Sequence, residues 1–384
     1  MRLLYLSTDP GVPVLGHKGA SVHVRAMTVA LVEAGVEVTV ASPRVAFEGE
    51  RLGARAALRE LSPVLPKQYA ETRALRAAIE RQAEEIAELA AAIGADAVYE
   101  RLALFSNGGV RAAAALGLPH LLEVNAPLTS EAARFRTLPH PEVAANVELE
   151  VLLRTDRVLA VSNTLARLLV EQGVEAARIQ VVPNGVSAAA VGAVTRRRGE
   201  SFTVGFAGSL KPWHGVDVLL RAFDAALRRE RSLQLEIVGS GPLAEAVRTS
   251  ALPAGSLRVH GQLTHDETLG AIAGWDVGVA PYPALENFYF SPLKVGEYMA
   301  CGACPVASDF PVLRELLGDG ERGVLVEPGD PGSLAAAFVG LARDRDRAAV
   351  LGERARRHAL ATLDWQRNAA TALDAMVDLA GAMV

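Results

Sequence analysis

Short apolar strands alternate with helical segments along this chain, and the alternation starts afresh in its second half. In the first half, Arg2 to Leu6 and Val36 to Ala41 are predicted strands. A helix lies between them, with Ser21 as its cap and Gly35 at its end. Phe202 to Phe206 then begins a second series of the same kind. Because repeated β-α-β units build parallel sheets covered by helices, the sequence predicts an α/β protein with two Rossmann-like domains.

The composition excludes several classes of protein. Half of the 384 residues are apolar, which is enough for two large cores. The net charge of −5 lacks the basic footprint of nucleic-acid binding, so no nucleic-acid partner is expected. No apolar run reaches the roughly 20 residues of a membrane-spanning helix, and the first residues show no signal-peptide pattern. We therefore expect a cytoplasmic protein, either a monomer or a homodimer.

One basic pattern bears on membranes. Arg51, Arg55 and Arg59 recur every four residues in an alanine-rich segment, which predicts a helix with a basic stripe. Acidic neighbours dilute this charge, so a solvated helix face is the preferred interpretation. Peripheral contact with an anionic membrane is the alternative.

The stretch from Phe288 to Gly302 carries the strongest functional signal. Ser291 and Pro292 precede a predicted helix over Leu293 to Ala300, with Ser as N-cap and Pro at the first helical position. Free N–H groups at such an end attract phosphate, and Lys294 adds a positive charge one turn later. Glu297 shares a face with Lys294, and its carboxylate suits a ribose diol. The pattern predicts a nucleotide-sugar site that includes Ser291, Pro292, Leu293, Lys294 and Glu297.

This stretch resembles the donor-site signature of family 4 glycosyltransferases, which are retaining enzymes of the GT-B fold. Their usual pattern is Glu-x7-Glu followed by a tail like Met-Ala-Cys-Gly. Glu297 matches the second Glu, which holds the ribose in the family. Tyr289 stands at the place of the first Glu, so the chain resembles the branch with Ser-Pro-Leu-Lys-x-x-Glu-Tyr-Met. The resemblance leaves Glu286 or Asn287 to supply the missing contact with the donor sugar.

The resemblance also implies a division of the chain. Residues 1–186 would form a Rossmann-like acceptor domain, and residues 187–364 a Rossmann-like domain for the nucleotide sugar. In the GT-B fold these two domains face a central cleft. The last helix, residues 365–384, would cross back to the first domain.

A glycine-rich loop joins the first strand to the first helix. It contains Gly16, His17, Lys18 and Gly19. Glycines let a backbone approach a ligand closely, and a helix end can meet an anion; a plain connecting loop is the alternative. In the family, the matching loop meets the donor phosphate and the acceptor. By resemblance we expect Gly16 and Gly19 to contact the donor, and His17 and Lys18 to contact the acceptor.

Polar residues also follow two predicted strands of the first domain. Arg101 comes just after the strand at Ala97 to Tyr99, and Asn125 just after that at Pro119 to Val124. Ligands of open parallel sheets bind at these carboxyl ends, so both residues are predicted to bind the acceptor. Asn125 also stands where many family members have a His beneath the donor sugar, which makes it a catalytic candidate. The alternative is that Glu123 and Asn125 only cap the loop.

In the second domain, the loop Gly208-Ser-Leu-Lys-Pro-Trp-His-Gly215 departs from the family. Family members usually place an Arg and a Lys here to bind the diphosphate, whereas this sequence has Ser209 and His214 in those places. Lys211, two residues from the place of the Arg, is the candidate for the missing charge and for catalysis. By the same resemblance, the donor set includes Gly208, Ser209, Lys211, the turn at Gly239, and Leu263 in the segment whose backbone holds the base.

These observations predict a retaining glycosyltransferase with catalytic candidates Lys211, Asn125 and Glu286. It would move a sugar from a nucleotide diphosphate sugar, UDP-linked by the habit of the family, to a small-molecule, glycan or lipid acceptor. No Asp-x-Asp element appears where a metal ion for the sugar nucleotide would sit, so we expect front-face displacement without a metal and without any cofactor beyond the co-substrate.

Three other functions remain open from the sequence. A nucleotide-sugar epimerase or hydrolase could share the fold. An NAD-dependent dehydrogenase would need a full dinucleotide fingerprint, which the Gly239 turn lacks. A sugar-binding protein would lack lysines directed at phosphate.

Overall fold

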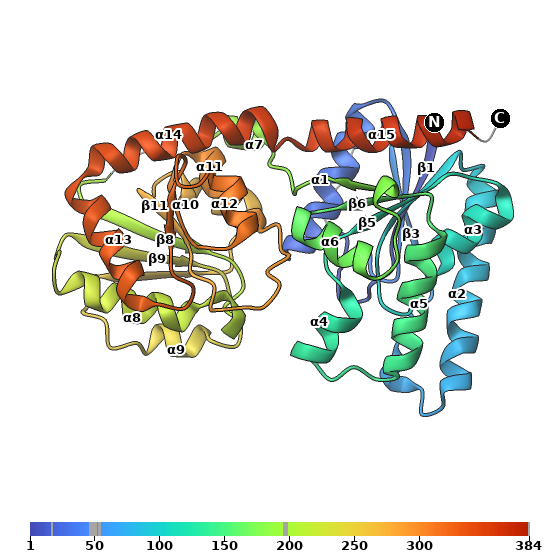
Figure 1. Ribbon diagram of the computed structural model, residues 1–384, viewed down its shortest axis with the longest axis horizontal. Coiled ribbons are helices and arrows are strands. Elements are labelled where there is room, and N and C mark those ends of the chain that lie inside the picture. The colour runs from blue at the N-terminus through green and yellow to red at the C-terminus, as the bar shows by residue number, and fades with distance from the viewer. Residues whose placement is uncertain (17, 46–51, 53–54, 195–198, 383–384) are drawn as a thin grey trace. The chain divides into compact units, whose positions relative to one another are not determined.

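The computed structural model describes residues 1–16, 18–45, 52, 55–194 and 199–382 (Figure 1). The chain divides into two compact units. The N-terminal unit comprises Met1–Pro183, Tyr289–Ser291 and Trp365–Val384, and the C-terminal unit comprises Asn184–Phe288 and Pro292–Asp364. The chain thus leaves the C-terminal unit for three residues inside the predicted donor stretch.

A seven-stranded parallel sheet forms the centre of the N-terminal unit, in the order β3-β2-β1-β4-β5-β6-β7. Its strands are β1 (Arg2–Ser7), β2 (Glu37–Ser42), β3 (Ala56–Glu60), β4 (Ala97–Arg101), β5 (His120–Val124), β6 (Arg157–Ala160) and β7 (Ile179–Val181). Most of these strands are buried apolar runs, as expected for a parallel sheet with helices on both faces.

The helices of this unit are α1 (Gly19–Glu33), α2 (Thr72–Ile93), α3 (Gly108–Leu116), α4 (Leu128–Phe135), α5 (Pro141–Arg154), α6 (Asn163–Glu171) and α15 (Trp365–Ala382), with short 3-10 turns at Pro66–Gln68 and Ala176–Arg178. Leu4 and Val98 of the sheet pack in one cluster with Ile86 of α2. The last helix, α15, packs on α1 (Figure 1), where the rings of Trp365 and His23 lie 4.7 Å apart.

The C-terminal unit has a six-stranded parallel sheet in the order β10-β9-β8-β11-β12-β13. Its strands are β8 (Phe202–Ala207), β9 (Leu233–Val238), β10 (Leu257–Gly261), β11 (Val277–Ala280), β12 (Cys304–Ser308) and β13 (Val324–Val326). Its helices are α7 (Ala188–Gly192), α8 (Val216–Leu227), α9 (Ala244–Arg248), α10 (His265–Ile272), α11 (Leu293–Cys301), α12 (Pro311–Leu317), α13 (Pro331–Arg343) and α14 (Arg345–Thr362), with a 3-10 turn at Pro212–His214. Phe206, Ile237, Phe223 and Phe338 meet in its core.

Both sheets confirm the predicted pair of Rossmann-like α/β domains. In each, the strand order reverses beside the first strand, between β1 and β4 and between β8 and β11. Ligands of such sheets bind at the carboxyl ends of the strands near this reversal. Ser7, the last residue of β1, pairs with Arg101 of β4, so Arg101 lies at that edge.

Local residue types mark the ends of two helices. Gly94 ends α2 with a left-handed backbone, at φ 57°. The hydroxyl of Ser162 caps α6 by accepting a hydrogen bond from the Leu165 N–H.

Three local predictions are wrong. Arg55 and Arg59 do not lie on a helix: Arg59 belongs to β3, where it pairs with Ala41 of β2, so sheet pairing overrides the helical propensity of the segment. Arg51 lies outside the described residues. Ser21 is not a cap, because α1 begins at Gly19 and Lys18 is the N-cap residue.

Ser291 is likewise not the N-cap of the donor helix. Pro292 holds that place, and α11 begins at Leu293. The preceding residues, Tyr289 to Ser291, belong to the N-terminal unit, where the Tyr289 carbonyl accepts a hydrogen bond from Ser162.

Candidate active site

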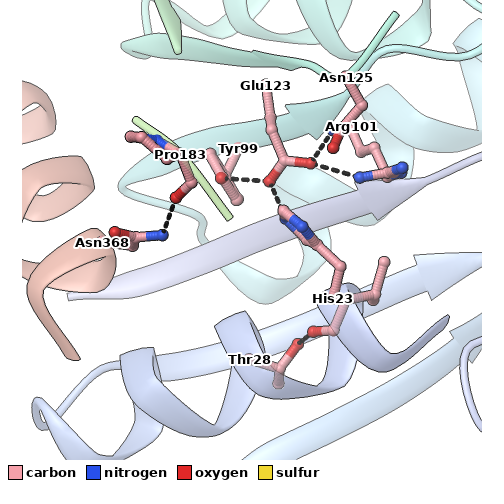
Figure 2. A network of polar contacts seen from close by, with 9 residues as sticks. His23, Thr28, Tyr99, Arg101, Glu123, Asn125, Pro183 and Asn368 are labelled. Atoms are coloured by element: carbon pink, nitrogen blue, oxygen red, sulfur yellow. Dashed lines mark hydrogen bonds and ion pairs between the residues drawn. The ribbon is translucent and has the colours of Figure 1, made fainter. Parts of the chain in front are cut away.

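A buried carboxylate organises the polar residues at the carboxyl edge of the N-terminal sheet. Figure 2 shows Glu123 of β5 with donors around it from three elements. His23 Nε2 of α1 lies 2.6 Å from one carboxylate oxygen, and the Tyr99 hydroxyl of β4 donates to the same oxygen at 2.7 Å. Arg101 Nη1 donates to the other oxygen at 2.6 Å, and so does the Asn125 amide. We call these five residues the Glu123 cluster.

The electrostatics of this cluster keep the carboxylate charged. Burial by itself would raise the pKa of Glu123, but His23, Arg101 and the hydrogen bond from Tyr99 hold that pKa well below its usual range. Burial and the Glu123 charge raise the pKa of Tyr99 well above its usual value, so its hydroxyl stays a donor. The charged Glu123 carboxylate therefore orients Arg101 and Asn125 at the carboxyl edge of the sheet, where ligands of such sheets bind.

The cluster brings together the two residues that the sequence predicted at strand ends. The Arg101 side chain is 15% exposed, and its other guanidinium nitrogens make no hydrogen bond to the residues that the structure describes. Fixed, partly exposed donors of this kind suit an oxygen-rich ligand. Their roles as acceptor-binding residues remain predictions.

The glycine-rich loop of this unit is held by its own contacts. Lys18 donates from Nζ to the Gly11 carbonyl at 2.8 Å. A Cβ on Gly16 would lie 2.6 Å from Pro13, so packing requires glycine there. Gly19 is the first residue of α1. His17 lies outside the described residues, so its predicted role remains a prediction.

Lys294 is the central feature of the C-terminal unit. Its ammonium is buried and has no hydrogen-bond partner among the described residues. It lies 4.3 Å from the ring centre of Phe206 and 5.5 Å from that of Tyr282. A Cβ on Gly208, the residue after β8, would lie 2.9 Å from Nζ, so only glycine leaves this space open. Burial lowers the pKa of Lys294 to about 7, against the opposing effect of Glu297.

The loop between β8 and α8 contains a second lysine, Lys211, and a histidine, His214, that is uncharged. His214 Nδ1 lies 2.6 Å from the Ser209 carbonyl. Burial, and after it the charge of Lys294, lowers the pKa of His214 to about 3, so the imidazole is neutral. Lys211 Nζ lies 4.8 Å from the ring centre of Trp213. Positive charge in this region therefore comes from Lys211 and Lys294.

Glu297 lies one turn beyond Lys294 on α11 and has a partner that the sequence did not indicate. His265 Nε2, at the start of α10, lies 2.8 Å from its Oε1. The two side chains are 14% and 27% exposed for Glu297 and His265, respectively. Oε2 makes no hydrogen bond to the described residues.

The predicted glycine turn packs directly on this region. A Cβ on Gly239 would lie 2.0 Å from the Gly208 carbonyl oxygen, so the two loops require glycine at their contact. Leu263 directly precedes Thr264, the cap of α10. The structure thus brings Gly208, Ser209, Lys211, Gly239, Lys294 and Glu297 into one unit, with Pro292 and Leu293 at the start of α11. Gly16, Gly19 and Ser291 belong to the N-terminal unit.

The place of the family's first Glu holds no carboxylate. Tyr289 is 7% exposed, and its hydroxyl donates to Glu131 Oε2 at 2.8 Å within the N-terminal unit. Glu286 is exposed, and Asn287 beside it has a left-handed backbone with φ 52°. The contact of Glu286 with a donor sugar remains a prediction.

The described part of the chain offers neither a cluster of metal ligands nor a membrane-spanning helix. No group of three or more His, Cys, Asp or Glu side chains there is arranged to hold a metal ion. No helix among the described residues combines the length and apolar character needed to cross a membrane.

The sequence matches the models of two known protein families. The model of the family described as Glycosyltransferase Family 4 matches residues 17–190, and that of the family described as Glycosyl transferases group 1 matches residues 201–344. The first half of this chain is thus similar to glycosyltransferase family 4, and the second half to the glycosyl transferases of group 1. The finer assignment to the branch with the Ser-Pro-Leu-Lys motif remains a prediction.

Two curated relatives show the range of similarity. The phosphatidyl-myo-inositol mannosyltransferase of Mycolicibacterium smegmatis is 34% identical over 167 residues, or 42% of each chain. The alignment thus spans about two fifths of the length of that relative. The D-inositol 3-phosphate glycosyltransferase of Paenarthrobacter aurescens is 28% identical over 407 residues, or 97% of each chain.

Solved structures share the fold over the whole chain. Sucrose-phosphate synthase from Thermosynechococcus elongatus matches with a TM-score of 0.77 and 20% identity, covering 100% of both chains. Anabaena HepE in complex with UDP-glucose matches with a TM-score of 0.69 and 18% identity, covering 97% of this chain and 99% of HepE. With the two parallel-sheet units, these likenesses confirm the predicted GT-B fold.

Sequence reasoning missed several members of the site. Glu123 was considered only as a loop cap, and His23, Tyr99 and His265 were not singled out. One signal was available for Glu123: a carboxylate inside the apolar strand His-Leu-Leu-Glu-Val needs partners once it is buried. Nothing local marks His23 or His265, because their partners lie 100 and 32 residues away.

Proposed function

We propose that this protein is a family 4 glycosyltransferase, which transfers a sugar from a nucleotide diphosphate sugar to a hydroxyl of a phosphorylated polyol. The donor binds the C-terminal unit and the acceptor binds the N-terminal unit. The observation that carries the proposal is the buried ammonium of Lys294, which has no hydrogen-bond partner among the described residues.

A buried charge without a partner is costly, and an anion at the same place removes that cost. The diphosphate of a nucleotide sugar is such an anion. Lys294 stands in the first turn of α11, whose free N–H groups also favour phosphate. Gly208 leaves the ammonium open to a ligand, and Lys211 adds charge on the adjoining loop.

The same charges support departure of the leaving group. We propose a front-face displacement, in which the bond from the anomeric carbon to the diphosphate oxygen breaks as the acceptor oxygen bonds to the same face. Because the new bond forms on the face from which the old bond breaks, the anomeric configuration is retained. The acceptor proton passes to an oxygen of the departing diphosphate. Lys294 and Lys211 stabilise the diphosphate as it gains negative charge, without a metal ion.

The nature of the donor is supported by a protein of the same fold, since HepE was solved with UDP-glucose. The nature of the acceptor is supported by the relatives, whose names specify phosphatidyl-myo-inositol and D-inositol 3-phosphate. An inositol phosphate offers hydroxyls and a phosphate, and Arg101, which Glu123 holds in place, can meet the phosphate.

Titration calorimetry with UDP tests the donor site. We expect Lys294→Met to weaken UDP binding by about tenfold to a hundredfold, the value of a charged hydrogen bond. Lys67→Met, a change on a 3-10 turn of the N-terminal unit, is the matched control and should bind as the parent does. Equal UDP affinity in Lys294→Met and the parent would contradict the assignment.

Product analysis tests the reaction. Incubation with UDP-hexoses and inositol phosphate should give a glycoside with the anomeric configuration of the donor, determined by NMR, and EDTA should not reduce its yield. An inverted product would contradict front-face displacement. Donor consumption at the same rate without acceptor would instead indicate a hydrolase or epimerase.

A further inference from the structure

We infer that His265 is a positioning residue that holds Glu297 for recognition of the nucleotide ribose, and so sets the preference for ribose over deoxyribose. The inference rests on the proposed function, in which the C-terminal unit binds a nucleotide diphosphate sugar. It adds His265 to that site. It also predicts that the contact between His265 and Glu297 determines the preference for ribose over deoxyribose, which can be measured.

The contact itself is specific. His265 Nε2 lies 2.8 Å from Glu297 Oε1, and both side chains are largely covered. Since the carboxylate only accepts, the imidazole donates in this pair. Oε2 makes no hydrogen bond to the described residues, so one oxygen stays available for a ribose hydroxyl.

His265 is well placed to act as a fixed donor, because it is the first residue of α10. Its neighbours form a capping box, in which Thr264 accepts a hydrogen bond from the Glu267 N–H, and the Glu267 carboxylate accepts one from the Thr264 N–H. This reciprocal cap holds the first helical turn, and with it the backbone that carries the imidazole.

Glu297 needs such a support because its terminal torsion is otherwise broad. Lys294 lies three residues earlier on the same helix, and an i,i+3 ion pair with it is the obvious competing arrangement. In the structure Lys294 makes no hydrogen bond to Glu297. By holding the carboxylate, His265 keeps Glu297 ready for the sugar and leaves the ammonium of Lys294 ready for the diphosphate.

A purely structural link between α10 and α11 does not explain the pair as well. The two helices are already joined by a second contact, from the Cys301 thiol to the Leu269 carbonyl at 3.8 Å, and Leu269 is buried at their junction. Glu297 also lies three residues after Lys294, so the two side chains share one face of α11.

Calorimetry with UDP, 2′-deoxy-UDP and 3′-deoxy-UDP tests the inference on the full chain. We expect the parent to prefer UDP over at least one deoxy analogue by about tenfold or more, and Glu297→Gln to lose most of that preference. His265→Leu should reduce the preference by a similar factor. His265→Gln, which keeps a donor of similar reach, should restore most of it.

A matched control separates this role from general damage. His260 and Glu236 form another partly buried pair in the same unit, with Nε2 and Oε2 3.2 Å apart. His260→Leu should leave the preference for UDP unchanged. If His265 only supported the fold, His265→Leu would weaken all three nucleotides by the same factor.

The outcomes distinguish the two claims. If the parent binds no UDP, the proposed donor site is wrong and the inference falls with it. If the parent binds UDP and its deoxy analogues equally, the donor site stands and the inference about the ribose is overturned. If the parent and Glu297→Gln behave as expected while His265→Leu keeps the full preference, the inference alone is overturned.

Discussion

Each unit buries one charged side chain close to its parallel sheet, Glu123 in the N-terminal unit and Lys294 in the C-terminal unit, but the two charges are satisfied in opposite ways. Glu123 accepts hydrogen bonds from four side chains of its own unit. Lys294 is buried without a hydrogen-bond partner among the described residues. A satisfied charge serves the fold and orients its neighbours, whereas an unsatisfied buried charge requires an explanation, for which we propose the donor diphosphate. The Glu123 carboxylate is thus satisfied by its own unit, and the Lys294 ammonium is not satisfied by the described residues.

The largest expected effect concerns the stability of the Glu123 cluster. Glu123→Gln removes the charge that holds His23 and Arg101, so it should lower the free energy of unfolding by about 3–5 kcal/mol, as when a buried ion pair is broken. Urea unfolding at neutral pH measures it. Glu80→Gln breaks an exposed pair with Arg111 and should cost less than about 1 kcal/mol. Equal losses in the two variants would contradict the claim that the buried Glu123 carboxylate stabilises the fold more than an exposed ion pair does.

The next effect concerns the open space beside Lys294. Gly208→Ala puts a Cβ 2.9 Å from the ammonium at a residue with φ 143°, and should weaken UDP binding by about tenfold or more. Gly340→Ala is the control, because Gly340 lies in α13 with nothing near its Cβ position. That change should leave UDP binding unaltered and stabilise the helix by about 0.5–1 kcal/mol. Undiminished UDP affinity in Gly208→Ala would indicate that diphosphate does not bind there.

A pH series sharpens the comparison further. Because burial lowers the pKa of Lys294 to about 7, the ligand-free ammonium loses its proton above that pH. Affinity for UDP-glucose, whose diphosphate has no proton to lose there, should fall toward about tenfold per pH unit above pH 7. Lys294→Arg should remove this dependence, since guanidinium stays charged. A flat profile in the parent would mean that the charge of Lys294 does not contribute to binding.

The free energy of unfolding of the ligand-free protein should rise with pH, whereas its affinity for UDP-glucose falls. Between the folded pKa of about 7 and the usual value of 10.5, the unfolded chain holds the Lys294 proton and the folded chain does not. The unfolded state then binds more protons, so this residue makes stability rise with pH across that window. Unfolding measured at several pH values should show a smaller rise in Lys294→Met than in the parent.

The smallest effect concerns acceptor recognition by Arg101. Arg101→Gln should raise KM for inositol phosphate by about threefold to tenfold, with little change for unphosphorylated inositol, because only the phosphate meets the guanidinium. Arg111→Gln, at an exposed pair, is the control and should change neither value. An equal rise for both acceptors would place Arg101 at a hydroxyl instead of the phosphate.

The sequence by itself determined the architecture and most of the donor segment. Buried strands at regular intervals, a glycine that ends α2 and a serine that caps α6 are local signals, so their outcome depends on neighbouring residues alone. The spacing from Lys294 to Glu297 likewise follows from one helix. The segment around Arg59 was the exception, because a strand at the sheet edge depends on the partner β2 as much as on its own residues.

The tertiary structure alone decided which charges are paired. Glu123 meets His23 from a helix 100 residues earlier, and Glu297 meets His265 from a helix 32 residues earlier. These side-chain contacts depend on the order of the strands and on the packing of the helices, which no single segment of the sequence specifies. The same packing buries Lys294 against Phe206 and leaves its ammonium unpaired among the described residues. Tertiary packing therefore decided that the Glu123 carboxylate is satisfied within its unit and that the Lys294 ammonium is buried without a hydrogen-bond partner among the described residues.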